Sequence, residues 1–367
     1  MKTIDTDKKG GKVLVFCPIG LGNFIMASPA FRHLRNSYNQ GEVHILALKP
    51  GIKQMAEESG WFDSVHFWDP DSDTVKNGFK ILLKLRQLHF DYSISLFPTG
   101  HWKFCVFQRF IAAKMRFGFH YPHTPVPSVI QHFSIPAVVG SHDTEQNMEF
   151  LATILNRPAP SFFGLSFPLK IDDKIKIPHE TFFICHPGSS AERGMLKKRL
   201  PAEKYAALIN LIYSRFNVKC ILVGGPEEKP LRDSITLNAR EALIEMPTKN
   251  LNELGTVISR GCFFLGNDSG IMHMAVAMGK QCIVFFGPSD EERTGPYYLS
   301  TKVSRTTESS RGHLIIREIN RTSAPNGPKS KVTSNPKLKF AADDSLRILS
   351  VEKAWEKIEP YIHSLLQ

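Results

Sequence analysis

The sequence lacks several patterns that mark particular protein classes. Its six cysteines form no C-x-x-C pair, which excludes a zinc site or a disulfide framework, and we expect them to be small buried residues of a reduced protein. No G-x-G-x-x-G follows the first glycine turn, and no repeat of solenoid length is present. The basic residues form no stripe interleaved with aromatic residues, so nucleic acid is not an expected partner.

Long uncharged runs are also scarce. One run, residues 13–31, carries no charge over 19 positions and follows a basic KKGGK, as export signals and membrane spans do. Two prolines, two glycines and an asparagine interrupt this run. We therefore expect a buried strand, a turn and a helix, with an export signal or a span as the alternative.

The composition is that of an ordinary globular protein, with 42% hydrophobic and 22% charged residues among 367. This length suggests two domains. Lys and Arg number 46 against 35 Asp and Glu, a formal net charge of +11. The excess indicates an anionic partner such as phosphate or an acidic lipid, and it says nothing about the fold.

Short apolar runs alternate with amphipathic segments in both halves of the chain, which predicts parallel strands covered by helices. We expect an α/β protein of two Rossmann-like doubly wound domains facing a cleft at the carboxyl ends of their strands, where such sheets bind ligands. The expected parts are a first domain over 1–168, a polar linker over 169–180, a second domain over 181–345, and a C-terminal helix within 346–367 that crosses back to the first domain.

The expected strands and helices follow one another regularly. In the first domain we expect strands at 12–17, 42–48, 64–67, 92–97 and 115–118, and helices at 28–38, 51–59, 77–88, 102–111 and 145–155. In the second we expect strands at 181–188, 219–225, 262–268 and 281–288, and helices at 202–216, 228–239 and 270–278.

Residues 291–340 break this alternation. They hold ten Lys or Arg and four acidic residues, and so supply +6 of the net charge. A mobile surface loop is the favoured interpretation, and a basic lip for an anionic acceptor or a membrane is the alternative.

Glycines and hydroxyl residues follow several of the expected strands. The first turn reads CPIGLGNFIMASPAF, and the second domain opens with HPGSSAERGMLKKRLP. Ser189 and Ser190 can donate to phosphate oxygens, while Lys197, Lys198 or Arg199 can neutralise a diphosphate. A purely structural turn and a solvated basic loop remain the alternatives for these two segments.

Two further segments carry acidic residues at strand ends. In LVGGPEEK, a carboxylate after the glycines can accept both hydroxyls of a ribose, although Glu also favours helix N-termini. In FLGNDSGIMH, Asp268 and Ser269 end a strand, Gly270 allows a phosphate to approach, and His273 lies one helical turn further. A capped helix explains Asp268 and Ser269, but it does not explain the whole series of motifs.

Taken in order, IGLGNFIMASPAFRHLR, HPGSS…KKRLP, LVGGPEE, GNDSGIMHMAVAMG and VFFGPSD resemble glycosyltransferase family 9, the heptosyltransferases of lipopolysaccharide core assembly. The resemblance spans roughly residues 12–298. It implies a GT-B enzyme with an acceptor-side first domain and a nucleotide-sugar-binding second domain. It also implies an inverting transfer without metal or cofactor, from ADP-heptose to an anionic lipid-linked core sugar. Such an enzyme would be cytoplasmic, and peripheral contact with the inner-membrane surface is left open.

The resemblance also implies roles for particular residues. It assigns the diphosphate to Ser189, Ser190 and Lys198, and the ribose to Glu228. It assigns the donor pocket to Asp268, Ser269, Gly270 and His273. The motif TGHWK matches a first-domain loop facing the acceptor, which makes Lys103, together with Gly22, a candidate acceptor contact.

One departure from the family concerns the general base. Heptosyltransferases usually carry Asp after the glycine of the first turn, whereas this chain has Asn23, whose amide can orient a hydroxyl but cannot deprotonate it. Another group can be the base, with candidates His101, His142, Asp143 and Glu145, or the leaving phosphate or water can take the proton. The site can also bind donor without turnover. We favour a working enzyme, with Asn23 and Lys198 as its catalytic residues. A nucleotide-sugar epimerase is disfavoured, because such enzymes need catalytic carboxylates in the first domain and this chain offers no convincing set.

Overall fold

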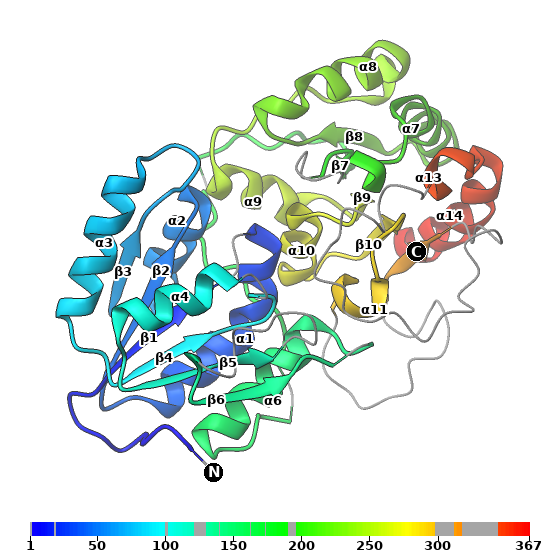
Figure 1. The fold of residues 1–367 in the computed structure, drawn as a ribbon. Coiled ribbons are helices and arrows are strands. Elements are labelled where there is room, and N and C mark those ends of the chain that lie inside the picture. The colour runs from blue at the N-terminus through cyan, green and yellow to red at the C-terminus, as the bar shows by residue number, and fades with distance from the viewer. Residues whose placement is uncertain are drawn as a thin grey trace. The chain divides into compact units, whose positions relative to one another are not determined.

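The computed structural model describes most of the chain and divides it into two compact units between Leu169 and Lys170 (Figure 1). The first unit comprises the described residues up to Leu169 and the second the described residues from Lys170. The described residues are 2–17, 20–99, 102–120, 130–138, 140–161, 163–172, 174–189, 196–297, 312–317 and 344–367.

The first unit contains a parallel sheet of six strands among its described residues, in the order β3-β2-β1-β4-β5-β6. This is the strand order of doubly wound dinucleotide-binding folds. The strands are β1 (Lys12–Phe16), β2 (Glu42–Ala47), β3 (Ser64–Phe67), β4 (Tyr92–Ser95), β5 (Met115–His120) and β6 (Phe133–Pro136). The helices are α1 (Leu21–Ser37), α2 (Pro50–Ser59), α3 (Val75–Gln87), α4 (Trp102–Ile111) and α6 (Asp143–Leu155).

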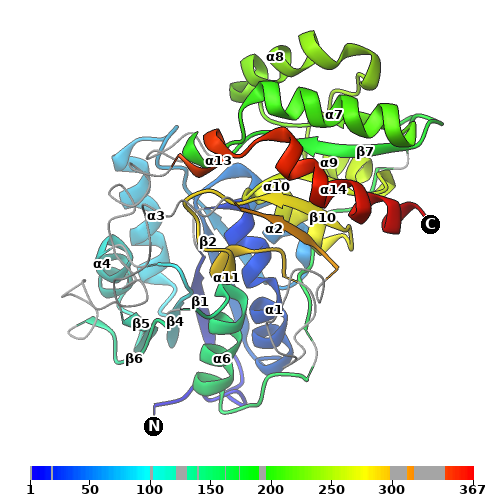
Figure 2. The same ribbon diagram turned by 90° about the vertical axis from the view of Figure 1, so that its right-hand side faces the viewer.

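Helices cover both faces of this sheet because its central strands are apolar on both faces. Leu14 and Phe16 of β1 point to one face, where they join a core with Leu85 of α3 and Phe104 of α4. Of the other helices, α1 packs against both α6 and α2. Figure 2 shows α3 and α4 on one side of the strands and α1 and α6 on the other. Right-handed crossovers in this strand order produce that division.

The second unit repeats the plan with five parallel strands among its described residues, in the order β11-β10-β9-β7-β8. The strands are β7 (Phe182–His186), β8 (Lys219–Leu222), β9 (Phe264–Asn267), β10 (Cys282–Phe285) and β11 (Leu314–Ile316). The helices are α7 (Ala202–Phe216), α8 (Lys229–Ala239), α9 (Leu251–Arg260), α10 (Gly270–Ala277), α11 (Glu291–Thr294), α13 (Ser345–Ile348) and α14 (Val351–Leu366), with single 3₁₀ turns η2 (Pro226–Glu228) and η3 (Arg240–Ala242). The expected α/β fold with two doubly wound sheets is confirmed.

Some element predictions were wrong. The first helix begins at Leu21 rather than at residue 28, with Pro29 inside it. The strands β6 and β11 and the helix α9 were not expected. β11 lies inside the segment 291–340, where it pairs with β10 as the edge of the second sheet. Residues 298–311 and 318–343 of that segment lie outside the described residues.

The last helix, α14, packs on α7 and β11 of the second unit. The physical reason is its apolar stripe, in which Ala354, Ile358 and Ile362 recur every four residues and are buried in the second unit's core.

Two other expectations concern cysteines and membranes. All six cysteines are free, five of them buried and Cys262 half-buried, as small apolar residues are. None of the helices that the structure describes has the length and hydropathy needed to span a bilayer.

Candidate functional site

The predicted site residues gather where the strand order of each sheet reverses. In the second unit this point lies between the neighbours β7 and β9, and the chain leaves these strands through His186 and Asp268. In the first unit it lies between β1 and β4, which lead to the turn before Asn23 and to Thr99. Open α/β sheets bind ligands in the crevice at such points.

A buried histidine joins two strand ends in the second unit. His186 Nε2 lies 3.0 Å from Glu228 Oε2, and His186 Nδ1 lies 3.0 Å from Ser269 Oγ. Because a carboxylate only accepts, Nε2 carries the proton and donates it to Glu228. The other ring nitrogen, Nδ1, faces the Ser269 hydroxyl, which itself accepts from Met272 N–H at 3.3 Å. The network therefore ties β7, η2 and the start of α10 together.

Glycines make room for the Glu228 carboxylate. A Cβ at Gly188 or at Gly224, whose φ is +153°, would overlap it. Glu228 Oε2 also accepts from Gly225 N–H at 3.0 Å. Burial works against ionisation of Glu228, but the hydrogen bond and charge of His186, helped by Gly225 and Arg199, hold its pKa below the usual value. The carboxylate is thus ionised and fixed.

A second ion pair lies beside this network. Lys198 Nζ donates to Asp268 Oδ2 at 2.6 Å, and both side chains are largely buried, with 16% and 6% exposed. Burial opposes ionisation of Asp268, but the charge of Lys198 outweighs it, so the pKa of Asp268 lies below its usual value. Thr294 Oγ1 donates to the same oxygen at 3.4 Å. The pair holds a fixed ammonium group at the carboxyl edge of the sheet.

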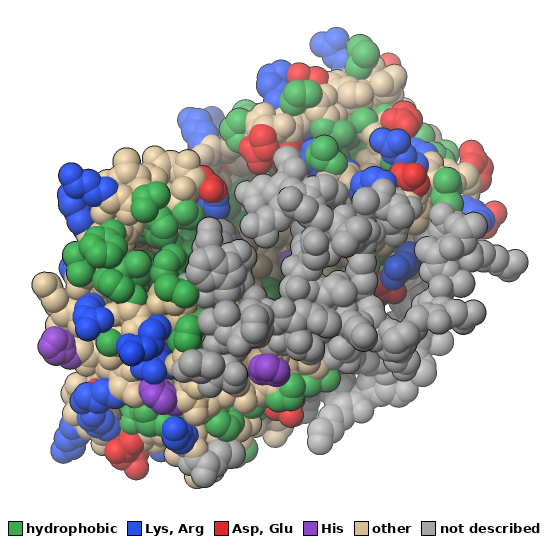
Figure 3. All heavy atoms as spheres, in the orientation of Figure 1, with side chains coloured by type: hydrophobic (Ala, Val, Ile, Leu, Met, Phe, Trp, Pro, Cys, Tyr) green, Lys and Arg blue, Asp and Glu red, His purple; other side chains and the backbone are tan. Residues whose placement is uncertain are grey.

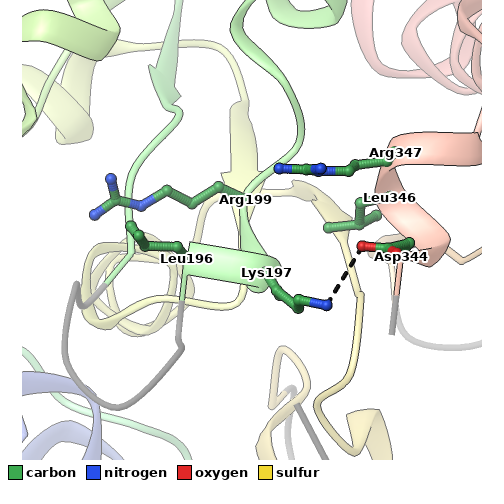
Figure 4. Close-up of a pocket in the computed structure, with 6 residues that line it drawn as sticks. All are labelled: Leu196, Lys197, Arg199, Asp344, Leu346 and Arg347. Carbon is green, nitrogen blue, oxygen red and sulfur yellow. Dashed lines mark hydrogen bonds and ion pairs between the residues drawn. The ribbon is translucent and has the colours of Figure 1, made fainter. Parts of the chain in front are cut away.

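The basic residues around Lys198 point in different directions. Arg199 bonds the Ser189 hydroxyl at 3.3 Å and the Ser189 carbonyl, and approaches Glu228 Oε1 at 3.7 Å. Lys197 instead bonds Asp344 at 3.4 Å. Figure 4 shows Lys197 directed toward Asp344 and Arg199 directed the other way. The pocket drawn there is lined by Leu196, Lys197, Arg199, Asp344, Leu346 and Arg347, so it lies beside the predicted donor residues rather than among them.

The start of α10 carries the remaining predicted donor residues. Ser269 is the N-cap of this helix and Gly270 its first residue, so free backbone N–H groups face the end of β9. His273 is buried, and burial lowers its pKa to about 4. Its Nδ1 has no hydrogen-bond partner among the described residues. The imidazole is therefore neutral and keeps an unused polar atom.

The first unit offers a sparser arrangement. Gly20 precedes α1 without a side-chain cap, Gly22 is buried in the first turn, and Asn23 is half-buried. The Asn23 amide makes no hydrogen bond with any residue that the structure describes. Three candidate bases lie at the start of α6, which packs on α1. Of these, His142 is the N-cap and its Nδ1 accepts from Thr144 N–H at 3.1 Å.

Some predicted residues are not placed. Ser190 and His101 lie outside the described residues, and Lys103 is described in α4 only by its backbone. Conversely, the sequence analysis overlooked His186 and Asn267. Asn267 accepts from Leu200 N–H at 3.1 Å and donates to Pro187 O at 2.7 Å, which pins the loop after β7 to the turn after Lys198. Their signal was their position as the last residues of two apolar strands.

The comparison with family models decides the family. The model described as glycosyltransferase family 9 (heptosyltransferase) matches residues 79–317. The chain belongs to glycosyltransferase family 9. It is therefore a glycosyltransferase, and the resemblance seen in its motifs is confirmed.

Two relatives carry related names. Lipooligosaccharide heptosyltransferase 2 of Haemophilus influenzae is 29% identical over 123 residues, which are 32% of this chain and only 34% of that protein. Lipopolysaccharide heptosyltransferase 3 of Escherichia coli is 19% identical over 288 residues, which are 73% of this chain and 81% of that protein. The chain thus matches about a third of the first relative and most of the second.

A solved structure shares the fold. The structure of Escherichia coli ADP-heptose LPS heptosyltransferase II superposes with a TM-score of 0.67 at 17% identity, covering 97% of this chain and all of the other. This supports the GT-B fold for the family 9 chain.

Proposed function

We propose that this family 9 enzyme transfers heptose from ADP-heptose, with inversion and without a metal or cofactor, onto an anionic lipid-linked sugar of the lipopolysaccharide core or a related surface glycan. The second unit is the donor side, and the first unit is the acceptor side. The observation that carries the proposal is the Lys198–Asp268 pair beside the His186–Glu228–Ser269 network. The names of the similar proteins, which mention ADP-heptose and lipopolysaccharide, supply the donor and acceptor classes.

The donor's diphosphate is assigned to Lys198, Ser189 and the N–H groups at the start of α10. Cleavage of a sugar–phosphate bond leaves negative charge on the departing diphosphate, and a fixed cation stabilises that charge most when water is excluded. Lys198 is 16% exposed and held by Asp268, so little reorganisation is needed when the charge develops. Ser190 completes this assignment as a further hydroxyl donor.

The nucleoside is assigned to Glu228. Its Oε2 already accepts from His186 and Gly225, which fixes the carboxylate and leaves Oε1, 3.7 Å from Arg199, as the oxygen for ribose hydroxyls. Asp268, Ser269, Gly270 and His273 complete the donor pocket. His273 is the neutral member, with an unpaired ring nitrogen for a polar group of the donor.

The acceptor is assigned to the turn before α1 and to Lys103. Gly22 lets the acceptor approach the backbone, and Asn23 orients the attacking hydroxyl. An inverting transfer forms the new glycosidic bond from the side opposite the leaving diphosphate. Since Asn23 cannot take the proton, the proton passes to His101 or one of the α6 candidates, to water or to the leaving phosphate. Loss of a general base slows transfer by about 100- to 10,000-fold without removing the effect of positioning.

The first experiment is calorimetric binding of ADP-, UDP-, GDP- and CMP-sugars, in parallel with a transfer assay in EDTA. Selective ADP-heptose binding with EDTA-resistant transfer supports the proposal. Preference for another nucleotide sugar overturns the donor, and loss of transfer in EDTA overturns metal independence. A binding protein without turnover is the second candidate, favoured by Asn23. Donor binding without product in the presence of acceptor would establish it.

A further inference from the structure

An apolar row lies on the outer face of α3, where a soluble protein normally has polar side chains. Val75, Phe79 and Leu83 are 83%, 52% and 40% exposed. They are four residues apart, so they line up along one side of the helix. On α4, Val106 is 40% exposed. Phe110, one turn further, packs against Phe79 with ring centroids 5.4 Å apart.

The neighbouring face of α3, about 100° around the helix from this row, holds the helix on its sheet. Leu82 and Leu85 are buried in the core with Leu14 and Phe16, and a Cβ at Gly78 would overlap the Trp68 indole. The helix is therefore seated tightly, and it cannot roll to hide the outer row. Hydrophobic side chains gather visibly over α3 and α4, with Lys and Arg around them (Figure 3).

Positive charge runs alongside this row. Lys76, Lys80 and Lys84 follow the apolar residues one position later, so they form a parallel row about 100° further around the helix. All three are exposed and form no ion pair with any described residue. Arg86 lies over the Phe110 ring at 5.7 Å. Exposed ammonium groups thus border the apolar side chains.

Among the described residues, negative charge on this face is confined to the N-terminal end of α3, where Asp73 precedes the N-cap Thr74 and accepts from Asn77 Nδ2 at 2.7 Å. Residues 74–142 contain eight Lys or Arg and a single acidic residue, Asp91. Asp91 is buried and neutralised by Lys8 at 2.6 Å and Lys114 at 2.8 Å. Two copies of such a face would repel each other, whereas an anionic surface would attract it. An apolar row bordered by lysines is the pattern of helices that lie in a membrane interface.

We propose that the outer face of α3 and α4 docks the enzyme on an anionic phospholipid surface. Val75, Phe79, Leu83 and Val106 enter the boundary between headgroups and acyl chains, and Lys76, Lys80 and Lys84 reach lipid phosphates. Only the purpose of this docking, which is to bring the enzyme to a lipid-linked acceptor, rests on the proposed function. The docking itself needs neither donor nor acceptor.

The test is flotation of the full chain with phosphatidylcholine vesicles that do or do not contain phosphatidylglycerol, without substrates. Binding is expected only with phosphatidylglycerol. Each lysine near an anionic surface contributes about five-fold in affinity, so K76Q/K80Q/K84Q should bind about 100-fold more weakly. F79N/L83N, which changes exposed side chains and should leave the melting temperature unchanged, should lose about ten-fold or more.

Matched controls remove the same chemistry elsewhere. K170Q/K174Q/K176Q removes three exposed lysines, and Leu237→Asn removes an 83% exposed leucine on α8; both should bind like the unchanged protein. Equal losses in these controls, binding to phosphatidylcholine alone, or no binding at all would overturn the proposal. So would sedimentation showing that F79N/L83N abolishes a dimer. Transfer to a delipidated acceptor is the separate readout of the proposed function, and it should stay unchanged in all four variants.

Discussion

The two units have the same architecture, yet different side chains lie where the strand order of each sheet reverses. In the second unit, His186, Glu228, Lys198 and Asp268 form buried charge-assisted contacts of 2.6 to 3.0 Å. In the first, the described residues after β1 offer a glycine backbone and the uncharged Asn23. The difference suits the proposed division of labour. A leaving diphosphate needs fixed charge, whereas an acceptor hydroxyl needs close backbone approach and orientation.

The largest effect on transfer is expected from a substitution of Lys198 in the charged site of the second unit. Lys198→Met removes the fixed cation, so kcat/KM should fall about 100- to 1,000-fold. Steady-state transfer and ADP calorimetry measure this. Lys197→Met is the matched control, because Lys197 pairs with Asp344 instead, and its activity should stay within about two-fold.

Lys198→Met also leaves Asp268 buried without its cation, which lowers stability. The double variant K198M/D268N should regain the melting temperature but not the activity. Recovery of activity in the double variant, or equal damage from Lys197→Met, would show that the cation has no part in donor binding.

A smaller loss is expected from the nucleoside end of the same network. Glu228→Gln removes the charged acceptor of the His186 proton, and Gly188→Ala displaces the carboxylate by overlap. Hydrogen bonds to charged groups contribute about 1.5 to 3 kcal/mol, so ADP-heptose affinity should fall about 10- to 100-fold in either variant. Calorimetry measures the affinity. Glu227→Gln is the neighbouring control and should bind normally; unchanged affinity in both test variants would remove Glu228 from the donor site.

How far the sequence predicts this network depends on how local each contact is. Asp268, Ser269 and Lys198 were predicted because their motifs combine a strand end with a helix start or a basic cluster. His186 was missed because its partners lie 42 and 83 residues away along the chain, and only the pairing of β7 with β8 and with β9 brings them together. For a related reason the apolar stripe of α14 was visible in the sequence, but the surface that it covers was not.

The fold shows the same limit. Alternating apolar runs predicted the two doubly wound sheets, because buried parallel strands need apolar residues on both faces. The edge strands β6 and β11 were missed, since β6 is only half-buried and β11 is three residues long. The start of α1 was missed because the glycines and Pro29 were taken to interrupt the uncharged run, whereas the helix begins at Leu21 and contains Pro29.

In the first unit, a more modest effect on turnover is expected from substitution of the uncharged Asn23. Asn23→Ala should lower kcat about ten-fold, since one orienting hydrogen bond is lost, while ADP-heptose affinity stays within about two-fold. The isosteric Asn23→Asp should keep the orientation and raise kcat, because a carboxylate can take the proton. Paired turnover and calorimetry decide between these outcomes, and unchanged turnover in Asn23→Ala would remove Asn23 from the mechanism.

The smallest effect on catalysis, but a distinct one on stability, is expected at His273. Burial lowers the pKa of His273 from 6.5 to about 4, so the folded protein keeps it neutral where the unfolded chain binds a proton. The free energy of unfolding should therefore fall as the pH drops from about 6.5 to 4, by up to about 3 kcal/mol from this group. Urea unfolding across this range measures the slope.

His273→Asn removes this titration and should flatten the slope, whereas His363→Asn on the exposed face of α14 should leave it unchanged. Part of the slope should survive in His273→Asn, because burial also lowers the pKa of His66 to about 4. An unchanged slope in His273→Asn would mean that the imidazole is charged or solvated in the folded state. The donor side would then lack the neutral, unpaired ring nitrogen of His273, and the Lys198–Asp268 ion pair would have a charged or solvated imidazole as its neighbour.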